Sequence, residues 1–177
     1  APQTRDKMAV TPQQMQKLVA EIAEEFDYVI IDCPAGIEQG FKNAIAGAKS
    51  AIVVTVPEVS AVRDADRIIG LLSASGIDDV WLLVNRLRPD MVKRGDMLAL
   101  DDTLDILGIE LIGVVPEDEK IIRSSNMGEP IVLTDKAAAG RAYRNITQRI
   151  LGGNVPLMDM DDGSGLGARL KKLFGGR

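Results

Sequence analysis

Four short apolar runs recur along the chain, and each one stops abruptly at turn or polar residues. The runs occupy residues 28–31, 51–56, 80–84 and 111–115. Stretches with helical apolar spacing separate them, at 15–25, 60–73, 97–107 and 137–151. Because short strands alternate with helices in this order, the sequence predicts an α/β fold with a mostly parallel, doubly wound sheet.

The first run ends in an acid and then in a turn, within the segment FDYVIIDCPAG. We expect 28–31 to be a strand buried on both faces, which places Asp32 at the carboxyl end of the sheet, where open α/β folds bind ligands. An aspartate there typically serves Mg²⁺ in nucleotide triphosphatases. Gly36 allows close backbone approach to a ligand, and its amide can face a γ-phosphate. An ordinary turn aspartate is the alternative.

Polar residues also end the third and fourth runs. The Asn85 side chain carries both donors and an acceptor and can therefore contact a purine edge, whereas the alternative is a turn asparagine. Pro116, Glu117 and Asp118 could line a base and ribose, or could begin a helix with proline and acids in its first turn. All these groups are expected at the same edge of one sheet.

Composition narrows the classes of function. The 177 residues carry a net charge of −5 and only 3% aromatic residues, which argues against general nucleic-acid binding and base stacking. With one cysteine and no histidine, the chain holds no disulfide framework, zinc site or Cys/His nucleophile pair. No apolar run approaches the length of a membrane span, and we expect a cytosolic protein.

The last residues differ from the rest in charge. Residues 165–177 carry +4, so the remainder carries −9. In LGARLKKLF the apolar Leu166, Leu170, Leu173 and Phe174 share one helical stripe, with Arg169, Lys171 and Lys172 beside it. A basic amphipathic helix of this kind fits an anionic membrane surface, and a terminal helix docked on the body is the alternative. Gly, Pro and Asp in 152–165 predict a flexible linker, which leaves residues 1–151 as the body and 166–177 as the helix.

A charged helical face is expected within EVSAVRDADR, where Ser60 is a candidate N-cap. Arg63, Asp64, Asp66 and Arg67 lie on its polar side. The simple interpretation is a solvated face with charge pairs, and the functional one is a contact surface for a partner or a second protomer.

Several segments together resemble the MinD family within the ParA/MinD class of deviant P-loop ATPases. They are FDYVIIDCPAGIEQG, TVPEVSAVRDADRIIG, RGDML, GVVPED, SNMGEPI and the terminal LKKLFGG. The resemblance implies a membrane-associated ATPase that dimerises around ATP, recruits MinC and, in many bacteria, responds to MinE. It implies a peripheral location on the cytoplasmic face of the inner membrane, with no specific nucleic-acid partner.

The resemblance also implies roles for individual residues. Asp32 matches the acid that meets Mg²⁺ through water, and Pro34, Ala35 and Gly36 match the switch segment that senses the γ-phosphate. Adenine- and ribose-binding positions match Asn85, Pro116, Glu117 and Asp118. The partner surface for MinC and MinE matches Ser60, Arg63, Asp64 and Asp66. The membrane-targeting helix matches residues 166–174.

The chain departs from the family in one large respect. Family members begin with a strand and a phosphate loop, KGGVGKT, which this sequence lacks. Roughly the first third of the family's chain is therefore expected to be missing, and the chain as given is expected neither to bind ATP tightly nor to hydrolyse it. Two alternatives remain: a non-enzymatic short form that binds membranes or partners, and a ParA-like partitioning ATPase, for which the acidic body lacks a basic DNA-binding face.

Overall fold

Helices and strands alternate along the chain in the computed structural model, which describes residues 10–34, 36–134 and 136–158. The elements are α1 (Pro12–Ile22), α2 (Gln39–Ile45), β1 (Ala51–Thr55), α3 (Val59–Ala74), β2 (Val80–Leu87), α4 (Pro89–Arg94), α5 (Leu100–Leu107), β3 (Glu110–Pro116), α6 (Lys120–Met127), the 3₁₀ helix η2 (Ile131–Leu133) and α7 (Ala138–Ile150). They form two units. The first contains Ala1–Ala51 and Gly70–Asp79, and the second contains Ile52–Ile69 and Val80–Arg177.

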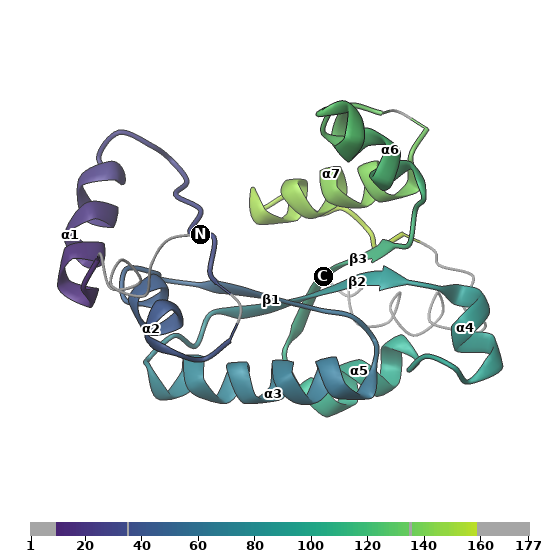
Figure 1. The fold of residues 1–177 in the computed structure, drawn as a ribbon, viewed down its shortest axis with the longest axis horizontal. Helices are drawn as coiled ribbons and strands as arrows, with labels where there is room; N and C mark the ends of the chain where they lie inside the picture. Colours follow the sequence, from purple (N-terminus) through teal and green to yellow (C-terminus); the bar gives the residue numbers. More distant parts are fainter. Residues whose placement is uncertain (1–9, 35, 135, 159–177) are drawn as a thin grey trace. The chain divides into compact units, whose positions relative to one another are not determined.

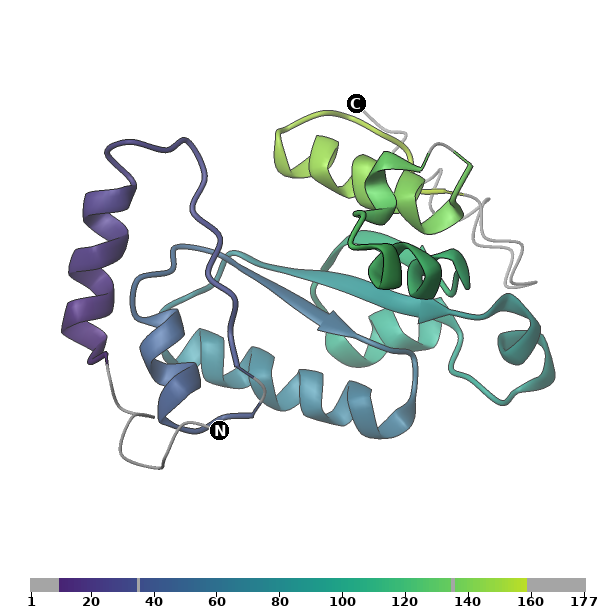
Figure 2. The ribbon, with the colours of Figure 1, turned by 45° about the horizontal axis from the view of Figure 1, so that its top comes forward.

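The second unit is built on a sheet of strand order β1-β2-β3, in which β2 and β3 run parallel. Helix α7 covers one face, while α5 and residues 59–69 of α3 cover the other (Figures 1 and 2). Because both faces are covered, neighbouring residues of β2 such as Leu82, Leu83 and Val84 are all buried. The predicted strands at 51–56, 80–84 and 111–115 and the parallel α/β fold class are therefore confirmed.

Helix α7 packs closely on β3 because a glycine lies beneath it. A Cβ atom at Gly113 would lie 2.3 Å from Cγ1 of Ile146, so any side chain at this position would push the helix away from the strand. The apolar cluster around this contact consists of Leu83, Ile112, Val115, Ala139, Ala142 and Ile146. This cluster fixes α7 against the sheet and thereby fixes the loop that precedes it.

Arg149 holds the segment that follows α7. Its guanidinium donates to the carbonyl oxygens of Ile112 at 2.7 Å, Val155 at 2.8 Å and Pro156 at 2.8 Å. Burial lowers the pKa of this guanidinium. Met158 also packs against the apolar cluster. In its described part, 152–158, the expected flexible linker is thus held on the body, and its remainder and the 166–177 segment lie outside the described residues.

The first unit contains α1 and α2. Thr11 caps α1, since its hydroxyl accepts from the Gln14 backbone N–H and the Gln14 side chain accepts from the Thr11 backbone N–H. The side-chain amide of Asn43 in α2 donates to the carbonyl of Val10. The expected helix at 15–25 is confirmed, although it begins and ends three residues earlier.

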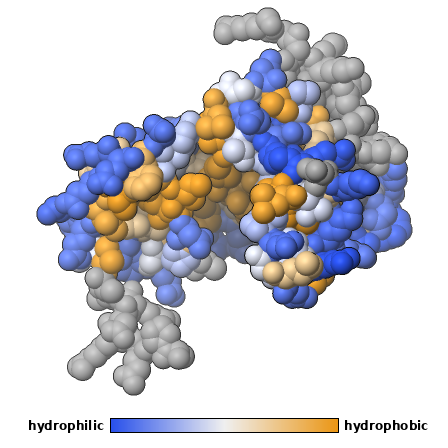
Figure 3. Space-filling model, turned by 90° about the horizontal axis from the view of Figure 1, so that it is seen from above, coloured by the Kyte–Doolittle hydropathy of each residue, from blue (hydrophilic) through white to orange (hydrophobic). Residues whose placement is uncertain are grey.

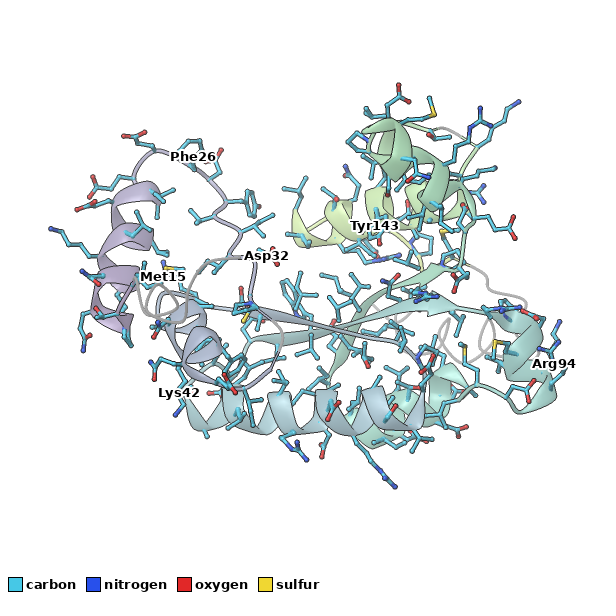
Figure 4. All side chains as sticks on the ribbon, in the orientation of Figure 1. Met15, Phe26, Asp32, Lys42, Arg94 and Tyr143 are labelled. Atoms are coloured by element: carbon cyan, nitrogen blue, oxygen red, sulfur yellow. The ribbon has the colours of Figure 1, made fainter. Side chains whose placement is uncertain are left out.

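The expected strand at 28–31 was wrong. Residues 28–34 have no regular secondary structure, and Tyr28 is 57% and Ile30 92% exposed. A strand exists only where a neighbour completes its backbone hydrogen bonds, and within the described residues no strand pairs with this segment. The segment between the labelled Phe26 and Asp32 is drawn as plain chain in Figure 4. Figure 3 shows exposed apolar surface in orange, and Tyr28 and Ile30 are among the exposed large apolar residues of the described chain.

Two smaller expectations also needed correction. Helix α3 begins at Val59, so Ser60 lies in its first turn and is not the N-cap. Strand β2 continues to Leu87, so Asn85 lies inside the strand and not after its end. Within the described ranges, no helix is both long and apolar enough to cross a bilayer.

Candidate functional site

The ends of β2 and β3 meet in the second unit, as the sequence predicted. The backbone N–H of Glu117 donates to the carbonyl of Leu87 at 3.0 Å, which joins the residue after β3 to the last residue of β2. Asn85 on β2 and Pro116, Glu117 and Asp118 on and after β3 therefore share one edge of the sheet. This is the edge where parallel α/β sheets bind ligands.

A β-bulge shapes this edge. Val84 pairs with Val114 and Leu87 pairs with Pro116, so two residues of β2 oppose one residue of β3. The second bulge residue, Arg86, has φ of 55°, in the left-handed region that residues other than glycine rarely occupy. Bulges occur often beside binding sites, where they redirect side chains.

Side chains bind to each other across the bulge. The Arg86 guanidinium donates to both carboxylate oxygens of Glu117, from Nε at 3.1 Å and from Nη2 at 3.3 Å. The hydrogen bond and the charge of Glu117 raise the pKa of Arg86, and the charge of Glu58 acts in the same direction. Oδ1 of Asn85 accepts from the Arg86 backbone N–H at 2.9 Å. The Nδ2 group of Asn85 has no hydrogen-bond partner among the described residues.

The carboxylate of Asp118 has a structural role. One oxygen of its carboxylate accepts from the Lys120 backbone N–H at 3.0 Å, and the other accepts from the Ala139 backbone N–H at 3.2 Å. Helix α7 has no side-chain cap of its own and no acid in its first turn. Asp118 therefore supplies the missing acceptor from the end of β3, and its carboxylate is already occupied by backbone donors.

Asp32 belongs to the first unit. Its side chain is exposed and forms no hydrogen bond or ion pair with another described residue (labelled in Figure 4). Burial and the charge of Asp32 raise the pKa of the neighbouring Cys33 thiol. No cluster of three potential metal ligands occurs among the described residues, so a Mg²⁺ ion near Asp32 would need further ligands such as phosphate oxygens and water.

The described residues between Asp32 and α2 form irregular chain and bends. Pro34 contacts the start of α2, because a Cβ atom at Gly40 would lie 2.9 Å from Cγ of Pro34. Gly36 has φ of 94°, with open space around the position of a Cβ atom, so its backbone is accessible. Ala35 lies outside the described residues.

The charged face of α3 lies open to solvent. Ser60, Arg63, Asp64 and Asp66 are exposed, and none of their side chains forms an ion pair with another described residue. The simple interpretation predicted charge pairs on this face, and the described structure has none among these residues.

Sequence reasoning missed Arg86 and Arg149. Arg86 follows the predicted Asn85 directly, and a polar pair at a strand end could have signalled an irregular ladder. Arg149 gave no signal, because its three carbonyl partners come from segments far apart in the sequence or beyond the helix.

Known proteins provide an independent comparison. A family model described as cellulose biosynthesis protein BcsQ matches residues 2–151. The septum site-determining protein MinD of Bacillus subtilis is 53% identical over 179 residues, covering 100% of this chain and 67% of that protein. The MinD cell division protein of Aquifex aeolicus and its MinC:MinD complex match with TM-scores of 0.81 and 0.82 at 42% identity, covering 85% of this chain and 65% and 63% of theirs.

A more distant structure agrees in fold alone. MinD of Pyrococcus horikoshii, solved with Mg-ADP, has a TM-score of 0.70 at 23% identity and covers 80% of this chain and 58% of that one. The fold, with its polar sheet edge, is that of the MinD/ParA class of P-loop NTPases. Within this class, the chain belongs to the MinD family of septum site-determining proteins. It spans between 58% and 67% of the length of the relatives named above.

Proposed function

We propose that this chain is the carboxyl-terminal part of a membrane-associated ATPase that dimerises with ATP and helps to position the division septum. The 53% identity to Bacillus subtilis MinD over the whole chain carries this proposal. The sheet edge supports it, since β2 and β3 bring Asn85 and Glu117 together where nucleotides bind in such folds.

The residues of the chain fit adenine nucleotide in part. Asn85 retains two amide donors without a described partner, and purine rings offer nitrogen acceptors. Asp32 is exposed and unpaired among the described residues, as a carboxylate that meets Mg²⁺ through water must be. Gly36 exposes its backbone, which can approach a γ-phosphate. When bound, Mg²⁺ would neutralise charge on the transferred phosphate, and Asp32 would meet it through water.

Partners and membrane use other surfaces. The exposed residues Ser60, Arg63, Asp64 and Asp66 on α3 form the surface for MinC, and for MinE where the host has it. The relative from Aquifex aeolicus was solved as a MinC:MinD complex, which supports a MinC partner. The basic helix 166–174 binds the anionic cytoplasmic face of the inner membrane. Two copies in a dimer bind more tightly than one, because the second helix binds at high effective concentration.

The proposed ATPase activity can be tested by supplying the phosphate loop that this sequence lacks. We join the chain to the amino-terminal third of the Bacillus subtilis relative and measure ATP hydrolysis. We expect the completed protein to hydrolyse ATP, the chain alone to show no hydrolysis, and Asp32→Ala in the completed protein to lose most turnover. Unchanged turnover in Asp32→Ala would remove Asp32 from the active site, and no hydrolysis by the completed protein would refute the proposed activity.

A further inference from the structure

The bulge in β2 combines an unfavourable backbone conformation with a specific pair of side chains. Arg86 has φ of 55°, a backbone conformation that glycine adopts readily but that other residues rarely adopt. Its guanidinium forms a two-point contact with Glu117 at 3.1 and 3.3 Å. The bulge therefore carries a side-chain contact that a glycine could not make.

Stability alone does not account for this arrangement. The side chains of Arg86 and Glu117 are 65% and 39% exposed, and ion pairs at such exposure add little to folding stability. A left-handed conformation at a residue other than glycine disfavours the folded chain. Such conformations persist where the surroundings enforce them, and they are concentrated at functional sites.

The two residues hold the bulge from both sides. Glu117 is fixed by its own backbone, whose N–H donates to the Leu87 carbonyl beyond the bulge at 3.0 Å. From there its carboxylate binds the Arg86 side chain, and the backbone N–H of Arg86 in turn binds Oδ1 of Asn85 at 2.9 Å. A chain of contacts thus runs from β3 through Arg86 to the amide of Asn85.

This chain of contacts determines which polar atoms of the Asn85 side chain remain available to a ligand. Oδ1 already accepts from the Arg86 N–H and keeps one lone pair, whereas Nδ2 keeps both of its donors. Its complement is an acceptor such as a purine ring nitrogen. We propose that Arg86 and Glu117 are positioning residues that hold the bulge and so orient the Asn85 amide as a donor toward the purine base, an inference that rests on the proposed nucleotide function.

The experiment separates base recognition from phosphate binding. In the completed protein described above, we measure the dissociation constants of ADP and of tripolyphosphate, which has no base, for Arg86→Gly and Glu117→Gln. Glycine tolerates the positive φ, so Arg86→Gly removes the pair without straining the bulge. Arg88→Ala is the matched control, because Arg88 is a nearby exposed arginine paired with Asp90 instead.

We expect each of the two variants to bind ADP about five- to twentyfold more weakly, which corresponds to about 1–2 kcal/mol. The double variant should be no weaker than the single ones, because both changes break the same contact. Tripolyphosphate affinity should stay at the wild-type value, the urea midpoint should not fall, and Arg88→Ala should bind both ligands normally.

The results that would contradict this inference differ in what they say about the proposed function. ADP binding that is unchanged in both variants would overturn the positioning role and leave the proposed function standing. Equal weakening of ADP and tripolyphosphate, or a lowered urea midpoint that accounts for the loss, would make the pair merely structural and also overturn the inference. A completed wild-type protein that binds no ADP would refute the proposed function and this inference together.

Discussion

The Asp118 carboxylate at the end of β3 accepts a hydrogen bond from the backbone N–H of Ala139 at 3.2 Å, across 21 residues of chain. Its other oxygen accepts from the Lys120 backbone N–H, so one side chain serves the first turns of two helices. Helix α7 begins with Ala137 as its N-cap residue, which has no side-chain acceptor. The link therefore takes the place of a local cap and ties the start of α7 to the sheet edge.

Replacing Asp118 with Ala should lower the free energy of unfolding by about 1–2 kcal/mol, the usual loss when a helix cap is removed. Asp118→Asn should lose less, because its amide keeps one acceptor oxygen. Urea unfolding measures both. Glu119→Ala is the control, since Glu119 forms no side-chain cap hydrogen bond in α6 and should change little. Equal stability of Asp118→Ala and wild type would show that these hydrogen bonds do not contribute to the free energy of unfolding.

Gly113→Ala should destabilise the second unit. The new Cβ would lie 2.3 Å from Cγ1 of Ile146, and such overpacking typically costs about 1–3 kcal/mol. Gly70→Ala is the matched control, because the exposed Gly70 lies inside α3 with open space around it. There the same substitution should raise the stability by about 0.5–1 kcal/mol, since alanine favours helix.

Thermal or urea unfolding of both glycine variants measures these two changes in stability, which should have opposite signs. A Gly113→Ala protein as stable as wild type would mean that α7 can move away from β3 without loss. That result would contradict the close packing of Ile146 on the strand.

Residues 80–84 show what the sequence could predict. A short apolar run between helical patterns is buried on both faces where helices cover both faces of its sheet, as they do for β2, which lies between β1 and β3. Residues 28–31 have the same local pattern but no strand beside them in the described structure, so the pattern alone could not decide their conformation. Strand formation depends on a neighbour, and a single run does not encode that neighbour.

The candidate site could likewise be predicted from the sequence only in part. That Asn85 and Glu117 would share a sheet edge followed from the parallel strand order. The bulge at Arg86 did not, because a bulge is fixed by the register between two strands and by a side-chain pair 31 residues apart. The structural use of Asp118 was equally hidden, since its partner Ala139 is distant in sequence and contributes only a backbone N–H.

Cys33 provides a probe of the Asp32 carboxylate, because it is the only cysteine in the chain. Burial and then the negative charge of Asp32 raise the pKa of its thiol, so the reactive thiolate forms at higher pH than usual. Asp32→Asn removes the second cause and should lower the pH midpoint of iodoacetamide alkylation, with faster modification at a given alkaline pH. Mass spectrometry across a pH series measures this midpoint.

The control is Glu38→Gln, which removes an acid from the same unit that is not among the causes of the Cys33 shift. It should leave the alkylation midpoint unchanged. If Asp32→Asn and Glu38→Gln gave the same midpoint as wild type, Asp32 would not act on the thiol, and the local geometry of the segment would need revision.

Replacing Leu170 and Phe174 with Glu should abolish sedimentation with vesicles of anionic phospholipid. Each large apolar side chain contributes at most about 1.5–3 kcal/mol when it is buried in a membrane, so losing two can weaken binding by up to about two to four orders of magnitude. Leu133→Glu is the control for one such change of charge, because Leu133 is 75% exposed on η2 of the body. It should sediment like wild type. A double variant that still sediments with vesicles would refute the membrane role of residues 166–174.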